Sequence, residues 1–155
     1  MAVEDLILDL KKGIGLVRVD AAAELGKRKE KQAVPALINA LRDTNMAVRN
    51  NAAFALGEIG AREAISPLAD ALRDPEERVR KSVVKALGMI GAGEAIAPLV
   101  RILDTDTSPL VRKSALRSLG QIGGPEALQA VERFISSPDA ALADMARKAL
   151  MQGRR

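Results

Sequence analysis

The stretch VRKSVVKALGMIGAGEAIAPL, which begins at Val79, decides the fold, because a close copy of it stands on either side. VRNNAAFALGEIGAREAISPL begins 31 residues earlier at Val48, and VRKSALRSLGQIGGPEALQAV begins 32 residues later at Val111. The same spacing relates the Leu-Gly pairs of the chain, which are Leu25-Gly26, Leu56-Gly57, Leu87-Gly88 and Leu119-Gly120. A fixed period of this length predicts a stacked array of repeats.

Each period contains two helical patterns. The first covers about residues 63–73, where apolar side chains recur at the spacing of one helix face (Ile65, Leu68 and Leu72). The second covers about residues 75–90, and its expected buried stripe is Val79, Val83, Ala86, Leu87 and Ile90. The same register reaches both ends of the chain, so the sequence predicts five helix pairs.

Turn residues mark both ends of the second helix. We expect Asp74-Pro75 to start it, because Asp can cap free N–H groups and Pro presets φ for the first turn. The same signal recurs at Ser108-Pro109 and at Ser137-Pro138-Asp139. A glycine that suits the left-handed stop position follows the helix at Gly60, Gly91 and Gly123. The first repeat lacks this glycine.

The composition excludes several classes of chemistry. The chain has 155 residues, of which 48% are apolar, but Phe54 and Phe134 are its only aromatic residues, so the core must be aliphatic. Without Cys there is no disulfide or thiolate metal site, and without His the commonest general base and metal ligand are absent. No apolar run approaches the roughly 20 residues of a membrane span. We expect a soluble, cytoplasmic protein that has no membrane association.

The pattern VRxxAxxALGxIG followed by EAIxPLxxALRD resembles the short HEAT-like repeats of the phycobilin-lyase type. The resemblance implies an all-α fold, a right-handed α-solenoid of about five two-helix repeats in one domain over residues 1–155. The implied repeats are about 1–27, 28–60, 61–91, 92–123 and 124–155. The last repeat has Ala143 and Met151 where Arg and Gly are expected, as end repeats of an array require. A one-residue insertion falls near Asp104-Thr105-Asp106.

Three arginines follow an aspartate by six residues, in the pairs Asp43 and Arg49, Asp74 and Arg80, and Asp106 and Arg112. They could form a phosphate clamp. The resemblance implies instead a structural ladder of Arg–Asp contacts between neighbouring repeats, which suits the planar fork of arginine. Lys12 takes the place of the aspartate before Arg18, so that arginine could pair only across the joint with the next repeat.

The outward positions of the second helices change from copy to copy. In HEAT-like arrays these helices line the concave surface, so the resemblance implies that these positions meet a partner. The expected partner-binding residues are Asn50, Phe54, Lys81, Lys85, Lys113, Arg117 and Lys148. Position Ser82 and its equivalents should also point away from the core. A basic helix face can equally be only solvated, and a slight helix rotation could bury Phe54. Phe134 is expected in the core.

These features favour a non-enzymatic scaffold that binds an acidic segment of another protein, which the net charge of +4 permits. No catalytic, cofactor-binding or metal-binding residue is expected. One alternative is chromophore attachment like that of the phycobilin lyases, or a chaperone subunit. A second alternative is binding to the phosphate backbone of nucleic acid, which the lack of Trp and Tyr disfavours. The oligomeric state stays open.

Overall fold

The structure is a computed structural model, and it describes residues 1–154 of the chain. Within these residues there are ten α-helices and three one-turn 3₁₀-helices, and no strand. The α-helices are α1 (Val3–Lys12), α2 (Gly15–Lys27), α3 (Val34–Ala40), α4 (Met46–Ile59), α5 (Ile65–Ala71), α6 (Glu77–Ile90), α7 (Ile96–Thr105), α8 (Pro109–Ile122), α9 (Gly124–Glu132) and α10 (Ala140–Gly153). The 3₁₀-helices η1 (Lys31–Ala33), η2 (Arg62–Ala64) and η3 (Gly93–Ala95) lead into α3, α5 and α7. The prediction of an α-solenoid built from helix pairs is confirmed.

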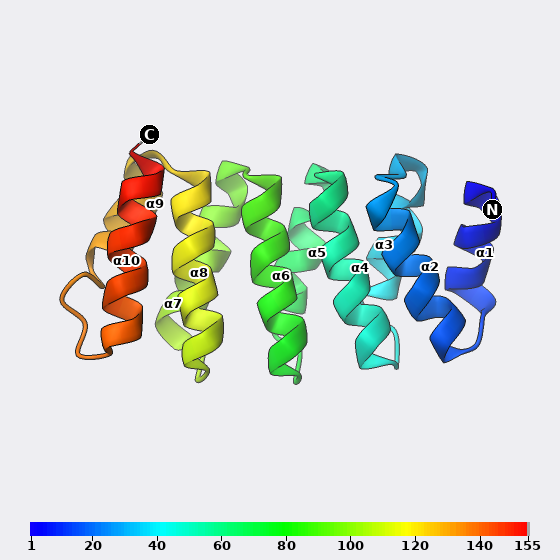
Figure 1. Cartoon of the computed structure of the whole chain (residues 1–155), viewed down its shortest axis with the longest axis horizontal. Helices are drawn as coiled ribbons and strands as arrows, with labels where there is room; N and C mark the ends of the chain where they lie inside the picture. The colour runs from blue at the N-terminus through cyan, green and yellow to red at the C-terminus, as the bar shows by residue number, and fades with distance from the viewer. Residues whose placement is uncertain (155) are drawn as a thin grey trace.

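The helices form two layers. Figure 1 shows α2, α4, α6, α8 and α10 side by side in one row, with α3, α5, α7 and α9 behind them. We call the row with even numbers the second-helix layer and the other row the first-helix layer. Each second helix packs against the second helices before and after it, and against the first helix of its own pair. The second-helix layer is therefore the continuous spine of the array.

The Leu-Gly pairs explain how closely the spine packs. A Cβ added at Gly57 would lie 2.8 Å from the Cα of Ala86 on the next second helix, and one at Gly26 would lie 2.6 Å from the Cα of Ala55. These distances leave no room for a side chain, so glycine allows neighbouring helices to meet backbone to backbone. The leucine beside each glycine is fully buried, as Leu56 shows. The pair thus supplies a close contact and a core side chain at every joint.

The second helix starts later than the sequence predicts. Asp74 does not cap α6: its Oδ1 accepts a hydrogen bond from the N–H of Glu76, 2.9 Å away, and Glu76 is the N-cap residue. The Asp74 carboxylate also binds Arg49 of the preceding pair, and Asp43 and Asp106 accept from the N–H two residues later in the same way. Ser108 and Asp139 do cap α8 and α10 through their side-chain oxygens.

Two of the three expected glycines end the second helices in the left-handed helical conformation, with φ of 74° at Gly60 and 72° at Gly91. The expectation for Gly123 is wrong, because its φ of 70° is combined with a ψ of −167° where the chain turns directly into α9. Lys29 holds the equivalent position in the first repeat, and its φ is 55°. The chain therefore keeps the same backbone geometry without glycine, at the cost of left-handed strain in an L-residue. The extra residue near Asp104 is absorbed by α7, which has 10 residues where α5 has 7.

None of the helices in residues 1–154 is long and apolar enough to cross a membrane.

Candidate functional site

Arginines and aspartates of successive helix pairs form a ladder along one edge of the array. Three forked ion pairs make its rungs, with Nε and Nη2 of the arginine donating to the two carboxylate oxygens. The rungs join Arg18 to Asp43 (2.9 and 3.0 Å), Arg49 to Asp74 (2.7 and 3.2 Å) and Arg80 to Asp106 (2.9 and 3.4 Å). Each arginine thus binds the aspartate of the following pair, not the one six residues before it.

Each rung is also tied to the backbone. Nη1 of Arg49 donates to the carbonyl oxygen of Asp43 at 2.9 Å, so the guanidinium clasps the loop of its own pair as well. The pKa of Asp43 lies below its usual value, because burial raises it less than hydrogen bonds from Arg18 and from the N–H of Asn45 lower it. The hydrogen bond to Asp74 raises the pKa of Arg49. These guanidinium groups already donate their hydrogen bonds to aspartates and carbonyl oxygens of the chain, so the structure does not support a phosphate clamp.

The expected pairing of Arg112 is wrong. Its Nε donates to the carbonyl oxygen of Leu103 at 2.9 Å, and its guanidinium lies 5.6 Å from the ring centroid of Phe134. The cause is that Ser137 stands where the next aspartate of the ladder would be. Ser137 keeps the turn, because its Oγ accepts from the N–H of Asp139 at 3.2 Å, but it carries no charge. Phe134, which is half-buried, takes over the role of partner.

Four of the proposed partner-binding residues form a group of cations on adjacent helices. Among residues 1–154 none of the four has a carboxylate within ion-pair distance. We call them the cation cluster: Lys81 and Lys85 on α6, and Lys113 and Arg117 on α8. The lysines are half-buried and Arg117 is exposed. Half-burial of a lysine is expected where its alkyl stem lies along the helix surface and its ammonium group reaches water.

Phe54 lies on α4, the helix next to the cation cluster, and is 43% exposed. Its neighbours Ala53 and Ala55 are buried, so the helix is not rotated to hide the ring. Met89, one turn after Lys85 on α6, is 42% exposed, and its sulfur lies beside the joint at Gly57. Met89 is not among the residues predicted from the sequence, although it is the apolar exception at a position where the neighbouring repeats have Glu58 and Gln121.

Two other residues of the expected set are engaged within the chain. Asn50 belongs to a joint, because its Oδ1 accepts from Oγ of Ser82 at 2.5 Å and its Nδ2 donates to Asn51 at 3.3 Å. Lys148 forms an ion pair with Asp144 at 3.0 Å, which lowers the pKa of that carboxyl. The structure therefore places Asn50 between helices rather than on a free surface.

The prediction that Ser82 and its equivalents point away from the core is also wrong. Its equivalents Ser114 and Met145 are buried, and Asn51 donates to the carbonyl oxygen of Val19 at 3.1 Å. This position points along the stacking direction, toward the preceding second helix, and not into solvent. The outward surface of the second-helix layer, which we call the second-helix face, is therefore narrower than the sequence suggests.

No group of three or more His, Cys, Asp or Glu side chains in the described part of the chain could hold a metal ion. What the geometry offers is a surface: cations and apolar side chains on a rigid row of helices. The fold is an α-solenoid whose second-helix layer presents a continuous surface.

A family model described as HEAT repeats matches residues 4–83 and 65–151, so the chain belongs to the HEAT repeat family. The resemblance seen in the sequence is thus confirmed. No curated protein sequence matches the chain.

Solved structures share the fold. The complex of CpcE and CpcF of phycocyanin lyase from Nostoc sp. PCC7120 matches with 30% identity and a TM-score of 0.84, over 98% of this chain and 65% of that chain. This chain thus spans just under two thirds of that one. A designed armadillo repeat protein in complex with the peptide (KR)4 matches with 26% identity and a TM-score of 0.75, over 97% of this chain and 81% of that chain. Human deoxyhypusine hydroxylase, at 17% identity and a TM-score of 0.54 over 98% and 84%, shares the fold alone.

Proposed function

We propose that the second-helix face binds an acidic segment of another protein. One observation carries the proposal: the cation cluster stands on two adjacent helices without carboxylate partners in residues 1–154, whereas the ladder arginines are fully paired. Unpaired cations on one face attract an acidic ligand over about 8 Å at physiological ionic strength.

The spacing of the helices suggests the form of the partner. Packed helices lie about 10 Å apart. A polyproline II segment repeats its side-chain direction every three residues and advances by about 3.1 Å per residue. Carboxylates three residues apart on such a segment would therefore match the step from Lys85 on α6 to Arg117 on α8. The exposed Phe54 and Met89 would receive apolar side chains of the same segment.

A similar solenoid supports this mode of binding. The designed armadillo repeat protein was solved with a peptide of alternating Lys and Arg. The cation cluster has the same sign of charge as that peptide, so the peptide that matches this chain would be acidic.

The test is a titration with a labelled extended peptide that carries Glu at every third position and Leu between, followed by fluorescence anisotropy. We expect binding that weakens as salt rises, and weaker binding of a peptide of the same composition with its Glu residues adjacent. A single-stranded oligonucleotide of equal charge serves as competitor. Equal binding of the two peptides, or tighter binding of the oligonucleotide, would contradict the proposal.

A second candidate is a role in handling a bilin chromophore, favoured by the similarity to the phycocyanin lyase complex over 98% of this chain. The test is to mix the protein with a free bilin and record the visible spectrum. A shifted absorption band supports this role, and an unchanged spectrum argues against it.

A further inference from the structure

The cation cluster is confined to two of the five second helices in residues 1–154. Two outward positions of each second helix, one turn apart, form two rows across the second-helix face. From α2 to α10 the first row holds Val19, Asn50, Lys81, Lys113 and Asp144, and the second row holds Ala23, Phe54, Lys85, Arg117 and Lys148. Only α6 and α8 carry a cation in both rows. The residues on the flanking helices α4 and α10 therefore decide how far a bound segment can extend its acidic residues.

Helix α10 carries an ion pair across the two rows. Nζ of Lys148 lies 3.0 Å from Oδ2 of Asp144, and the side chains are 67% and 59% exposed, so the pair stands on the surface. The hydrogen bond and the charge of Lys148 lower the pKa of Asp144, and the charges of Arg147 and of Lys113 on α8 lower it further. The Asp144 carboxylate thus neutralises Lys148 and places a negative charge within electrostatic reach of the cation cluster.

Helix α4 offers an apolar side chain and a carboxylate in place of cations. Phe54 is exposed in the second row. Glu58 follows one turn later and is half-buried, with its Oε2 2.6 Å from the place where a Cβ of Gly26 on α2 would lie. Asn50, in the first row, is held by Ser82. A segment that crosses from α6 to α4 thus leaves the cations and meets an aromatic ring.

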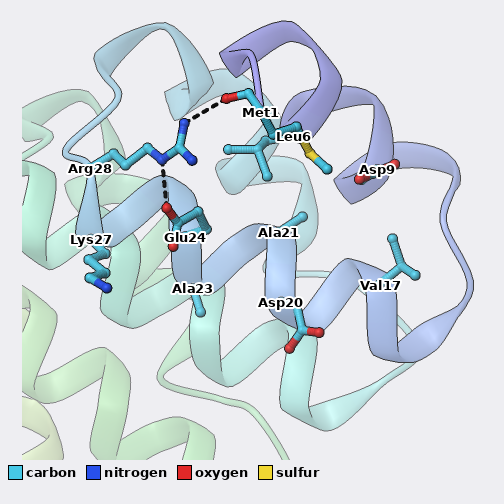
Figure 2. Close-up of a pocket in the computed structure, with 10 residues that line it drawn as sticks. All are labelled: Met1, Leu6, Asp9, Val17, Asp20, Ala21, Ala23, Glu24, Lys27 and Arg28. Carbon is cyan, nitrogen blue, oxygen red and sulfur yellow. Dashed lines mark hydrogen bonds and ion pairs between the residues drawn. The ribbon is translucent and has the colours of Figure 1, made fainter.

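Beyond α4, helix α2 has no cation in these two rows. Ala23 is exposed and points away from α1, as Figure 2 shows. Arg28 is engaged, because it donates to Glu24 at 2.6 Å (Figure 2). Lys27 is exposed, but Glu58 stands at the equivalent position of α4, between Lys27 and the cation cluster. The cation cluster is therefore bounded by a carboxylate on each flanking helix.

We infer that Phe54 and Asp144 set the register of the acidic segment, and this register rests on the proposed function. The segment places an apolar residue opposite Phe54, acidic residues opposite Lys85 and Arg117, and a neutral residue opposite Asp144. A polyproline II segment brings every third residue to the same face at a spacing that matches the helices, so these four residues stand three positions apart. A carboxylate in the last position would face Asp144, and such like-charge contacts discriminate against a wrong partner.

The test compares two labelled peptides by fluorescence anisotropy. Both carry Leu, Glu and Glu at successive third positions, and they differ only at the next third position, which is Gln in one and Glu in the other. Each is made in both chain directions, and the direction that binds more tightly is used. Wild type should bind the Gln peptide roughly threefold more tightly than the Glu peptide, the size of effect expected from one exposed charge. Asp144→Asn, which releases Lys148, should reverse this order.

Two controls separate the register from general effects of charge. Asp104→Asn on α7 changes the net charge equally and breaks an exposed pair with Arg133 in the first-helix layer, so it should keep the wild-type order. Replacing the Leu of the peptide by Gln should weaken binding to wild type by roughly fivefold and change it little for Phe54→Ala. Thermal unfolding of each variant verifies that it is folded.

Three outcomes would overturn the register: an unchanged order of the two peptides in Asp144→Asn, a reversed order in Asp104→Asn, or an equal effect of the Leu replacement in wild type and in Phe54→Ala. The proposed function would still stand in these cases if Lys85→Glu/Arg117→Glu weakened the binding of both peptides. Binding of neither peptide, or binding that this double variant leaves unchanged, would overturn the proposed function together with the register.

Discussion

Arg49 on α4 binds Asp74, 25 residues further along the chain, through two parallel hydrogen bonds of 2.7 and 3.2 Å. The side chains are only 14% and 6% exposed, so this rung is shielded from water on most sides. The same carboxylate fixes the turn before α6 through the N–H of Glu76. One side chain thus sets both the start of a helix and its attachment to the preceding pair.

Replacing Asp74 should therefore destabilise the fold. Asp74→Ala leaves a mostly buried guanidinium and a free N–H without partners, and we expect it to lower the free energy of unfolding by about 2–4 kcal/mol. Asp74→Asn retains a side-chain oxygen for the N–H of Glu76, so it should lower the free energy of unfolding by less than Asp74→Ala does. Glu94→Gln, which breaks the exposed pair with Arg62, should change stability by less than about 0.5 kcal/mol. Urea unfolding monitored by circular dichroism compares the three, and equal effects at Asp74 and Glu94 would refute a stabilising ladder.

The ladder also predicts how stability depends on pH. Because the pKa of Asp43 is lower in the folded protein, its contribution is complete above the unfolded value of about 3.9 and is lost as the pH falls through the folded pKa. Asp43→Asn should therefore flatten the fall in unfolding free energy below about pH 4. Denaturation of both proteins between neutral and strongly acidic pH measures the difference. Parallel curves would mean that Asp43 has the same pKa folded and unfolded.

Lys29 should be a site where glycine stabilises. Lys29 has a left-handed backbone, with φ of 55°, where the next two repeats have Gly60 and Gly91. Removing the strain of the L-residue should raise the free energy of unfolding by about 1 kcal/mol in Lys29→Gly, after the entropy cost of glycine. Gly60→Ala, which meets no atom within 4 Å, should lower it by a similar amount through φ alone. The midpoint temperature of thermal unfolding should therefore rise in Lys29→Gly and fall in Gly60→Ala.

The joint glycines should tolerate no side chain. At Gly57 a Cβ would lie 2.8 Å from the Cα of Ala86, so Gly57→Ala forces two helices apart and should cost about 1–3 kcal/mol. Gly93→Ala is the matched control, because nothing lies within 4 Å of its added Cβ. Chemical denaturation distinguishes the two, and a Gly57→Ala protein as stable as the control would show that the helices can separate freely.

Repetition explains why the sequence predicts so much of the fold. The spacing of the four Leu-Gly pairs, together with an apolar register that reaches both ends of the chain, predicts five helix pairs, because each copy repeats the same local signals. The wrong expectations share one cause: they concern residues whose role depends on the neighbouring pair. Asp74, which the sequence predicts as a cap, instead binds Arg49 of another pair. Asn50 is not free because Ser82 binds it across a joint.

Side-chain direction around a helix is the part that a single sequence specifies least. The Ser82 and Lys85 positions differ by less than one turn, yet Ser114 is buried while Arg117 is exposed. Arg112 lost its expected partner through one substitution in the next repeat, Ser137 in place of aspartate. Only the stacking of the pairs decides which positions face a joint and which face solvent.

The most direct measurement of the central claim is the affinity of the acidic peptide for Lys85→Glu/Arg117→Glu, compared with a control of equal charge, Arg73→Glu/Arg101→Glu, in which Arg73 follows α5 and Arg101 lies on α7. At about 0.15 M ionic strength, where exposed charges are screened beyond about 8 Å, we expect the first variant to lose roughly tenfold or more in affinity and the control to lose far less. Equal losses in the two variants would contradict binding on the second-helix face.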